Sequence, residues 1–128
     1  MAAIHAGWRG LADGIIEAAL EALSLDPVDT LVWLGPAIGA TAFEVGPDVY
    51  HAFVDQDEQA KTAFKTLSED KWLADIYYLA RLRLYHYHIN HIYGGDYCTF
   101  TEPDKFYSYR RDGEQSGRMA SMVWFSEK

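Results

Sequence analysis

The stretch His5-Ala6-Gly7-Trp8-Arg9-Gly10-Leu11 lies between a short apolar segment, Ala2 to Ile4, and a run of residues with helical periodicity. The sequence therefore predicts a strand that enters a helix through a tight turn. The two glycines of this turn allow positive φ or a close approach of the backbone to a ligand. The helix that follows would present unpaired N–H groups, which favour an anion.

The turn also contains two side chains suited to ligand contacts. Arg9 is the only lysine or arginine among the first sixty residues, which contain ten Asp and Glu. A single cation in a glycine-flanked turn indicates a ligand contact, and the alternative is an ordinary turn with a packed Trp8 and a surface Arg9. His5 ends the predicted strand, where ligands of layered α/β folds tend to bind, and neutral imidazole is a common zinc ligand. From the residues alone, a packed or capping histidine remains the alternative.

Hydrophobic periodicity and turn residues predict helices and strands in irregular alternation along the rest of the chain. Helices are expected over residues 11–23, from Pro47 through Phe53, and from Leu73 to Tyr87. The last of these places Ile76, Leu79, Ala80 and Leu84 on one face. Strands are expected over residues 30–34 (buried), 43–45, 89–93, 106–110 and 119–125. This order predicts an α+β fold, with a layered mixed β-sheet flanked by helices, rather than a parallel Rossmann sheet.

Composition is that of a globular protein of one-domain length. The chain has 128 residues, of which 49% are hydrophobic and 15% aromatic. Its net charge of −8 argues against nucleic acid or an anionic membrane as a partner. We recognise no secretory signal and no apolar run long enough to span a bilayer. The single cysteine cannot form an internal disulfide, which favours a reducing cytoplasm.

Two further features invite a functional interpretation that the residues do not favour. His86, His88 and His91 suggest a metal site, but residues 86 and 88 diverge on a helix, and histidine is common at helix C-termini. Their structural interpretation is therefore preferred. Cys98 suggests a nucleophile, but a lone cysteine is more often a small buried apolar residue, and no partner spacing supports catalysis.

Arg110 and Arg111 form the third candidate group. The segment from Tyr107 to Asp112 alternates like a strand, so the two arginines are expected to face opposite ways. One of them is suited to bidentate contact with a phosphate or carboxylate, and the other to pairing with Asp112. The sequence does not show which is which.

A series of motifs extends over nearly the whole chain. They are His5-Ala6-Gly7-Trp8-Arg9-Gly10, Leu34-Gly35-Pro36-Ala37-Ile38-Gly39, Phe43-Glu44-Val45-Gly46, Leu73-Ala74-Asp75-Ile76, Gly94-Gly95-Asp96-Tyr97-Cys98-Thr99, Phe106-Tyr107-Ser108-Tyr109-Arg110-Arg111-Asp112 and Gly117-Arg118-Met119-Ala120-Ser121. In this order they resemble the YfiH family, also called laccase-domain proteins, polyphenol oxidases or peptidoglycan editing factors. Each motif is modest alone, and their order makes the resemblance specific.

The resemblance implies that part of the family's domain is absent. Family members are about twice as long, with the His-Ala-Gly-Trp-Arg motif near their middle. We therefore expect residues 1–128 to be the C-terminal part of a single YfiH-like domain, through a truncated gene model, a split gene or a fragment. The family's metal centre uses two histidines and one cysteine. By motif, His5 corresponds to the second histidine, and the other two ligands belong to the absent N-terminal half.

The resemblance also implies a function. It points to a zinc-dependent enzyme that phosphorolyses adenosine, inosine or guanosine and also deaminates adenosine. His5 would be a metal ligand or a general acid/base, with Arg9 and Arg110 as phosphate-binding candidates. The expected partners are a nucleoside, phosphate and the missing N-terminal half. The alternatives are a copper-dependent, laccase-like polyphenol oxidase, a peptidoglycan-precursor editing hydrolase, and an inactive fragment or interaction module that needs a partner chain.

Overall fold

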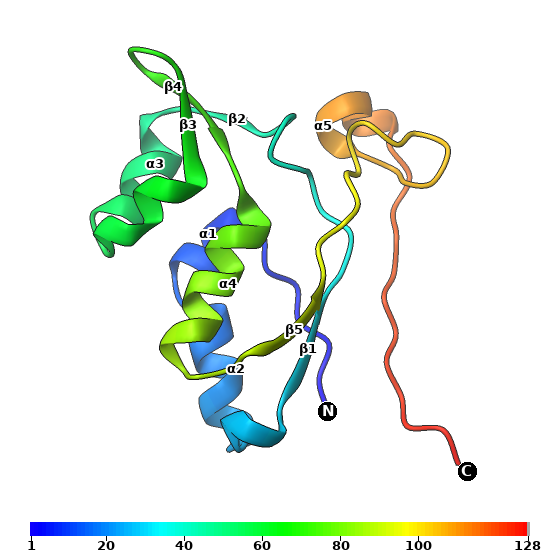
Figure 1. The fold of residues 1–128 in the computed structure, drawn as a ribbon. Coiled ribbons are helices and arrows are strands. Elements are labelled where there is room, and N and C mark those ends of the chain that lie inside the picture. The colour runs from blue at the N-terminus through cyan, green and yellow to red at the C-terminus, as the bar shows by residue number, and fades with distance from the viewer. Residues whose placement is uncertain (128) are drawn as a thin grey trace.

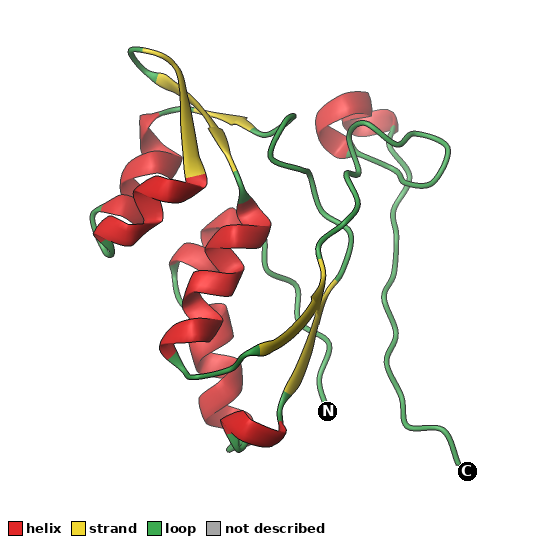
Figure 2. Ribbon diagram, in the orientation of Figure 1, coloured by secondary structure: helices red, strands yellow, loops and turns green. Residues whose placement is uncertain are grey.

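The computed structural model describes residues 1–127, in which short helices pack beside two small β-sheets (Figures 1 and 2). One sheet pairs two parallel strands, β1 (Leu31–Leu34) and β5 (His91–Gly94). The other is antiparallel, in the order β2 (Glu44–Val45), β4 (Lys71–Ala74) and β3 (Phe64–Ser68). The predicted α+β class is confirmed.

The helices of the described residues are short. The α-helices are α1 (Trp8–Ala12), α2 (Ile15–Leu23), α3 (Pro47–Val54), α4 (Ile76–His86) and α5 (Tyr109–Asp112), and 3-10 turns span Pro27–Asp29, Glu58–Ala63 and Gly113–Gln115. Helices α1, α2 and α4 lie on one side of the β1–β5 sheet, and the core between these elements includes Leu11, Leu79 and Ile89 (Figure 1). Among the described residues, every helix is too short or too polar to cross a bilayer.

The single helix expected over residues 11–23 is instead two helices. Gly14 adopts a left-handed conformation with φ 96°, and the chain turns there between α1 and α2. This φ suits glycine because it has no Cβ, so the sequence contains the cause of the break. Gly7 and Gly10, in contrast, do not have positive φ. Gly7 is extended (φ −66°, ψ 171°), and Gly10 lies within α1.

The helix expected to begin at Leu73 begins three residues later, at Ile76. Residues Lys71–Ala74 form β4, which pairs with β2 and β3 on its two sides. Asp75 then caps α4, because its carboxylate accepts a hydrogen bond from the Tyr78 N–H at 3.0 Å. The predicted buried face of Ile76, Leu79, Ala80 and Leu84 is confirmed.

The strands β1 and β5 confirm two predicted strands, but β1 is not buried as expected. Its alternate residues Val32 and Leu34 pack against the core, whereas Leu31 and Trp33 are exposed. At the end of β5, Gly94 adopts φ 83°. A Cβ at this position would collide with the carbonyl oxygen of Leu34 on the neighbouring strand. Glycine is therefore required where the two parallel strands end.

Three of the predicted strands are wrong. Ala2 to Ile4 and residues 119–125 form no strand, because neither segment has a strand partner among the described residues. Residues 106–110 lead into α5 instead, because the side chain of Ser108 accepts a hydrogen bond from the Arg111 N–H at 3.3 Å and caps the helix. A local cap stabilises a helical turn that alternation alone does not predict.

Candidate functional site

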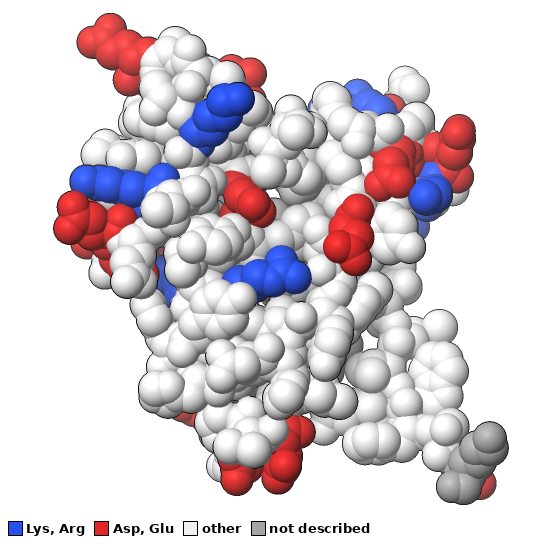
Figure 3. Space-filling model, in the orientation of Figure 1, with Lys and Arg blue, Asp and Glu red and all other residues white. Residues whose placement is uncertain are grey.

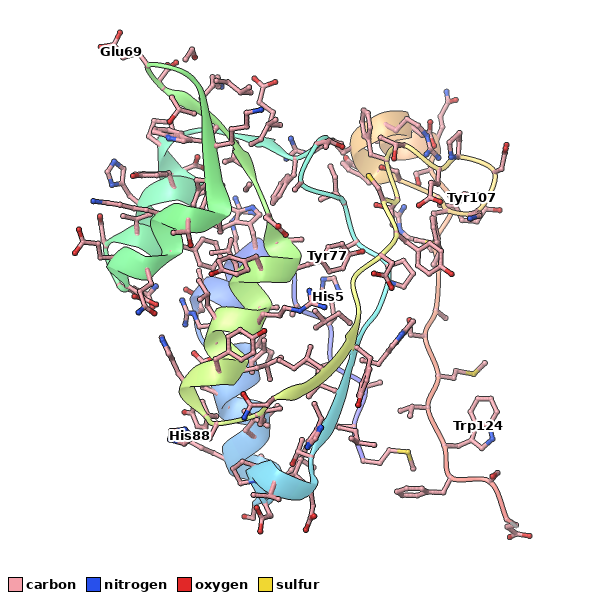
Figure 4. All side chains as sticks on the ribbon, in the orientation of Figure 1. His5, Glu69, Tyr77, His88, Tyr107 and Trp124 are labelled. Atoms are coloured by element: carbon pink, nitrogen blue, oxygen red, sulfur yellow. The ribbon has the colours of Figure 1, made fainter. Side chains whose placement is uncertain are left out.

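His5 lies on the extended N-terminal segment that leads into α1 (Figure 4). Its side chain is exposed, and its Nε2 atom is 3.5 Å from the position that a Cβ on Gly7 would occupy. A side chain at position 7 would therefore be in ordinary van der Waals contact with the imidazole. An accessible imidazole can accept or donate a proton, or bind a metal through its neutral form.

Arg9 lies on the first turn of α1 and is also exposed. Its guanidinium stacks over the indole of Trp8, with 4.6 Å from Cζ to the ring centroid. Stacking on an aromatic face leaves the N–H donors at the edge of the guanidinium open. Within residues 1–127, no protein acceptor hydrogen bonds to Arg9. The arrangement can bind an oxyanion through two parallel hydrogen bonds.

A cavity formed by the described residues lies elsewhere, beside the first two turns of α4. It has a volume of about 440 Å³ and is open to solvent. Its wall includes Tyr77 and Arg81 of α4, and Asp96, Cys98 and Glu102 of the loop after β5. His5 and Arg9 are not part of the wall. Figure 3 shows this face of the molecule, with one basic side chain near its middle and acidic side chains around it.

The charge of the cavity argues against an anion there. Three carboxylates line it, those of Asp75, Asp96 and Glu102, against the single guanidinium of Arg81. That guanidinium already donates to the carbonyl oxygen of Gly94 at 2.9 Å. A surplus of negative charge raises the energy of a bound anion. Arg9 is therefore a better candidate than the cavity for binding phosphate.

Tyr77 joins the cavity wall to the loop after β1. Its hydroxyl accepts a hydrogen bond from the Ala37 N–H at 2.6 Å and lies 2.7 Å from the carbonyl oxygen of Tyr97, to which it donates. Burial raises the pKa of Tyr77 above its ordinary value, against the opposing effect of the Ala37 hydrogen bond. Tyr77 therefore stays protonated and holds the two loops together (Figure 4).

Replacing Tyr77 by phenylalanine should lower the free energy of unfolding by about 1–3 kcal/mol. The change leaves the Ala37 N–H and the Tyr97 carbonyl without a shared partner. Tyr85→Phe is the matched control, because Tyr85 is exposed and its hydroxyl makes no hydrogen bond within residues 1–127. Urea unfolding of both variants measures the difference. Equal stability of the two variants would contradict a structural role for the Tyr77 hydroxyl.

Cys98 is less buried than a small apolar core residue would be, and its Sγ accepts hydrogen bonds. The N–H of Gly39 donates to its Sγ at 3.1 Å, and a Cβ on Gly39 would lie 3.1 Å from the Cys98 Cβ. Burial raises the pKa of Cys98, but hydrogen bonds from the Thr101 side chain and from backbone N–H groups outweigh it, so the net pKa lies below the ordinary value. The folded protein therefore favours the Cys98 thiolate more than the unfolded chain does.

The alkylation of Cys98 by iodoacetamide should show a lower midpoint pH in the folded chain than in the urea-unfolded chain. The thiolate is the nucleophile, and the folded state lowers its pKa. By linkage, this contributes stability above the unfolded pKa, which is lost as the pH falls through the folded pKa. Thr101→Val should raise the midpoint. A folded midpoint at or above the unfolded one would refute the hydrogen-bonding argument.

The structure distinguishes the roles of Arg110 and Arg111. Arg111 pairs with Asp112 at 2.9 Å and donates to the carbonyl oxygens of Thr99, Phe100 and Phe106, so it holds the loop before α5 in place. Arg110 is exposed and donates to the carbonyl oxygen of Glu44 at 2.9 Å. Arg110 is therefore the more available of the two, although its guanidinium is already partly engaged.

The three clustered histidines occupy different environments. His86 ends α4 and lies 3.5 Å from the Asp57 carboxylate, whereas His88 adopts φ 61° in the turn that follows. His91 begins β5 and is exposed. Of the three, only His86 lies at the helix end, whereas His88 lies in the turn that follows and His91 in β5. The preference for a structural role remains a prediction.

The described residues do not fit a zinc or copper centre by themselves. Residues 1–127 contain no group of three His, Cys, Asp or Glu side chains placed to hold a metal ion. A catalytic zinc usually has about three protein ligands, and His5 supplies one imidazole. Any metal site that includes His5 therefore needs ligands from outside this chain.

Sequence reasoning proposes His5 and Arg9 as site residues, and it missed the cavity and its wall. The Tyr77 hydroxyl meets Ala37 across 40 positions of the sequence, and Cys98 meets Gly39 across 59. Neither contact leaves a local periodic pattern. A partial signal was that Asp75 and Tyr77 lie two positions apart at the start of α4, which places a capped helix end and a phenol at one site.

Comparisons with known proteins agree over most of the chain. The profile of the family described as "Multi-copper polyphenol oxidoreductase laccase" matches residues 1–126. A purine nucleoside phosphorylase of Haemophilus influenzae is 51% identical over 127 residues, which are 98% of this chain and 52% of that protein. Purine nucleoside phosphorylase YfiH of Escherichia coli is 52% identical over 97% of this chain and 50% of its own.

Solved structures show the same partial match. The Neisseria meningitidis protein NMB0706 superposes with a TM-score of 0.83 at 50% identity, and the match covers 85% of this chain and 45% of that one. YlmD from Geobacillus stearothermophilus gives a TM-score of 0.78 at 29% identity, covering 88% of this chain and 44% of its own. The chain thus spans about half the length of the relatives it matches.

Proposed function

The chain belongs to the YfiH family of laccase-like proteins, and from this premise we propose that it carries part of the site of a purine nucleoside phosphorylase. The observation that carries the proposal is the pairing of an exposed imidazole, His5, with the open guanidinium of Arg9 four residues later. The names of relatives at about 50% identity support it. The single cysteine supports a cytoplasmic location.

In phosphorolysis a phosphate oxygen attacks the anomeric carbon of the ribose, and the bond from that carbon to the purine nitrogen breaks. The bond electrons leave with the base, which needs a proton. We propose that Arg9 holds the attacking phosphate through bidentate hydrogen bonds. We propose that His5 acts as the general acid toward the leaving base, or alternatively as a ligand in a metal site completed elsewhere.

Two finer proposals rest on the family alone. The first is that the metal is zinc, with His5 as one ligand. The second is that the complete enzyme also deaminates adenosine. Residues 1–127 do not form a metal site by themselves.

The test uses a chimaera in which this chain replaces the matched segment of the Haemophilus influenzae relative. Phosphate-dependent release of hypoxanthine from inosine by the chimaera would support the proposed function. A folded chimaera that binds neither inosine nor phosphate, measured by calorimetry, would refute it. The covalent link makes this test independent of how well two separate halves associate.

Arg9→Ala in the chimaera should lower phosphorolysis about a hundredfold, because one charged contact to the attacking phosphate is lost. Adenosine deamination should fall much less, because water and not an anion is the co-substrate. Arg118→Ala is the control, since Arg118 is equally exposed and stacks over the ring of Tyr109. Arg110→Ala separates the two phosphate candidates. Equal losses of both activities in Arg9→Ala would count against a phosphate role.

A further inference from the structure

The arginines of the chain differ in what their guanidinium groups contact. Most of them donate hydrogen bonds to protein acceptors, namely Arg81, Arg83, Arg110, Arg111 and Arg118. Arg9 makes no such bond within the part of the chain that the structure describes. A guanidinium carries five N–H donors and no acceptor. Arg9 is therefore the arginine whose donors remain available for a ligand.

The guanidinium of Arg9 is nevertheless held on one face. Its Cζ lies 4.6 Å from the ring centroid of Trp8, whereas the same distance is 5.1 Å for Arg110 over Phe43. Among aromatic rings, indole gives the strongest cation–π contact. Consecutive residues of a helix do not face each other, so this contact depends on the reach of the two large side chains. Arg9 is thus ordered by stacking and not by hydrogen bonds.

Trp8 is itself anchored, since its half-buried indole packs against the hydrophobic core. A ring fixed by the core limits the rotation of the exposed Arg9 side chain stacked on it. A side chain that is ordered before binding loses less conformational entropy when a ligand binds. The N–H groups project from the edge of the stacked guanidinium, which is the geometry of bidentate contact with an oxyanion.

Other sources of attraction for an anion are weak at this position. Helix α1 has only five residues, so few peptide dipoles add up along it. The net charge of −8 gives no general attraction for anions. The affinity for phosphate therefore depends on how well the Arg9 guanidinium is oriented.

We propose that Trp8 is a positioning residue for phosphate: its indole holds the Arg9 guanidinium with the N–H edge free to bind the anion. This proposal rests on the proposed function, in which Arg9 binds the attacking phosphate, and adds the residue that sets the phosphate affinity. Trp8 acts through Arg9 and needs no contact with phosphate or nucleoside.

Kinetics of the chimaera test the proposal with phosphate and inosine varied separately. Trp8→Leu keeps an apolar side chain but removes the aromatic face, so the KM for phosphate should rise about fivefold while the KM for inosine stays within about twofold. Trp8→Phe keeps an aromatic face and should restore most of the phosphate affinity. Trp72→Leu is the matched control, because Trp72 is also half-buried against the core but stacks on Tyr50.

A double variant tests whether Trp8 acts through Arg9. When Arg9 is already alanine, Trp8→Leu should raise the KM for phosphate no further, because the platform then has nothing to orient. Additive effects of the two substitutions would overturn the proposal. So would a Trp8→Leu variant in which kcat and both KM values change together, since that pattern indicates a general structural role.

A titration of the 128-residue chain with inorganic phosphate gives a readout that does not need turnover. The Nε–Hε resonance of Arg9 should shift in the parent chain, with a midpoint about fivefold higher in Trp8→Leu. Circular dichroism verifies folding, and Trp8→Met replaces Trp8→Leu if the latter is not folded. An Arg9 resonance that does not respond to phosphate, or equal midpoints in parent and variant, would overturn the proposal. A Trp8-dependent midpoint with a chimaera that lacks phosphorolysis would instead refute the proposed function alone.

Discussion

Replacing His5 by alanine in the chimaera is expected to lower phosphorolysis about a thousandfold. As the general acid, His5 would protonate the departing base, and as a ligand it would hold one position of a metal site. Either role is lost with the imidazole. Since the side chain is exposed on an extended segment, its removal should leave the folding free energy within about 0.5 kcal/mol of the parent.

The two roles of His5 are distinguished by metal content. If His5 is a ligand, the purified His5→Ala chimaera should contain less zinc than the parent by elemental analysis. If it is the general acid alone, zinc should be unchanged while the basic limb of the pH–rate profile disappears, because a general acid acts only in its protonated form. Unchanged turnover would contradict both roles.

A triple variant with glutamine at His86, His88 and His91 is the matched control. It removes three imidazoles but leaves His5 in place. Because these residues lie in different environments, with His86 beside Asp57, we expect metal content and turnover to stay close to those of the parent. Loss of bound metal in this variant would show that the cluster, and not His5, carries the metal.

The elements that the sequence predicts well are those with a local cause. Pro47 opens α3, the buried face of α4 repeats with helical periodicity, and the apolar runs near residues 31 and 91 form β1 and β5. The break at Gly14 is also local, since the residue needs positive φ, but a glycine within a helical pattern is not always a break. Local patterns therefore predict which elements exist better than where they begin and end.

The elements that the sequence mispredicts depend on distant partners. Lys71–Ala74 is a strand because β2 and β3 lie on both sides of it. Residues 119–125 have strand composition, yet no strand partner exists for them in the described residues. The contacts of the candidate site also depend on residues that are distant in the sequence. A motif identifies His5 and Arg9, whereas the contacts of Tyr77 and Cys98 join segments 40 and 59 residues apart.

The isolated chain is expected to hold no stoichiometric zinc and to turn over no nucleoside. The chimaera, in contrast, should hold stoichiometric zinc and turn over nucleosides. A catalytic zinc takes about three protein ligands, and the described residues bring no such group together. One exposed imidazole binds zinc weakly, because nothing orients further ligands around the ion. The cavity beside α4 does not compensate, since its wall contains neither His5 nor Arg9.

Elemental analysis after gel filtration, together with a phosphorolysis assay with inosine, measures both properties in the isolated chain and in the chimaera. The monomeric fraction of the isolated chain is used, because exposed apolar side chains such as Trp33, Trp124 and Phe125 favour association. Stoichiometric zinc and full turnover in that fraction would contradict the expectation. Cys98→Ser and His51→Ala would then identify the ligands, since Cys98 carries a thiol of lowered pKa and His51 is exposed. If both variants keep the metal, the carboxylates of Asp75, Asp96 and Glu102 around the cavity are the remaining candidates.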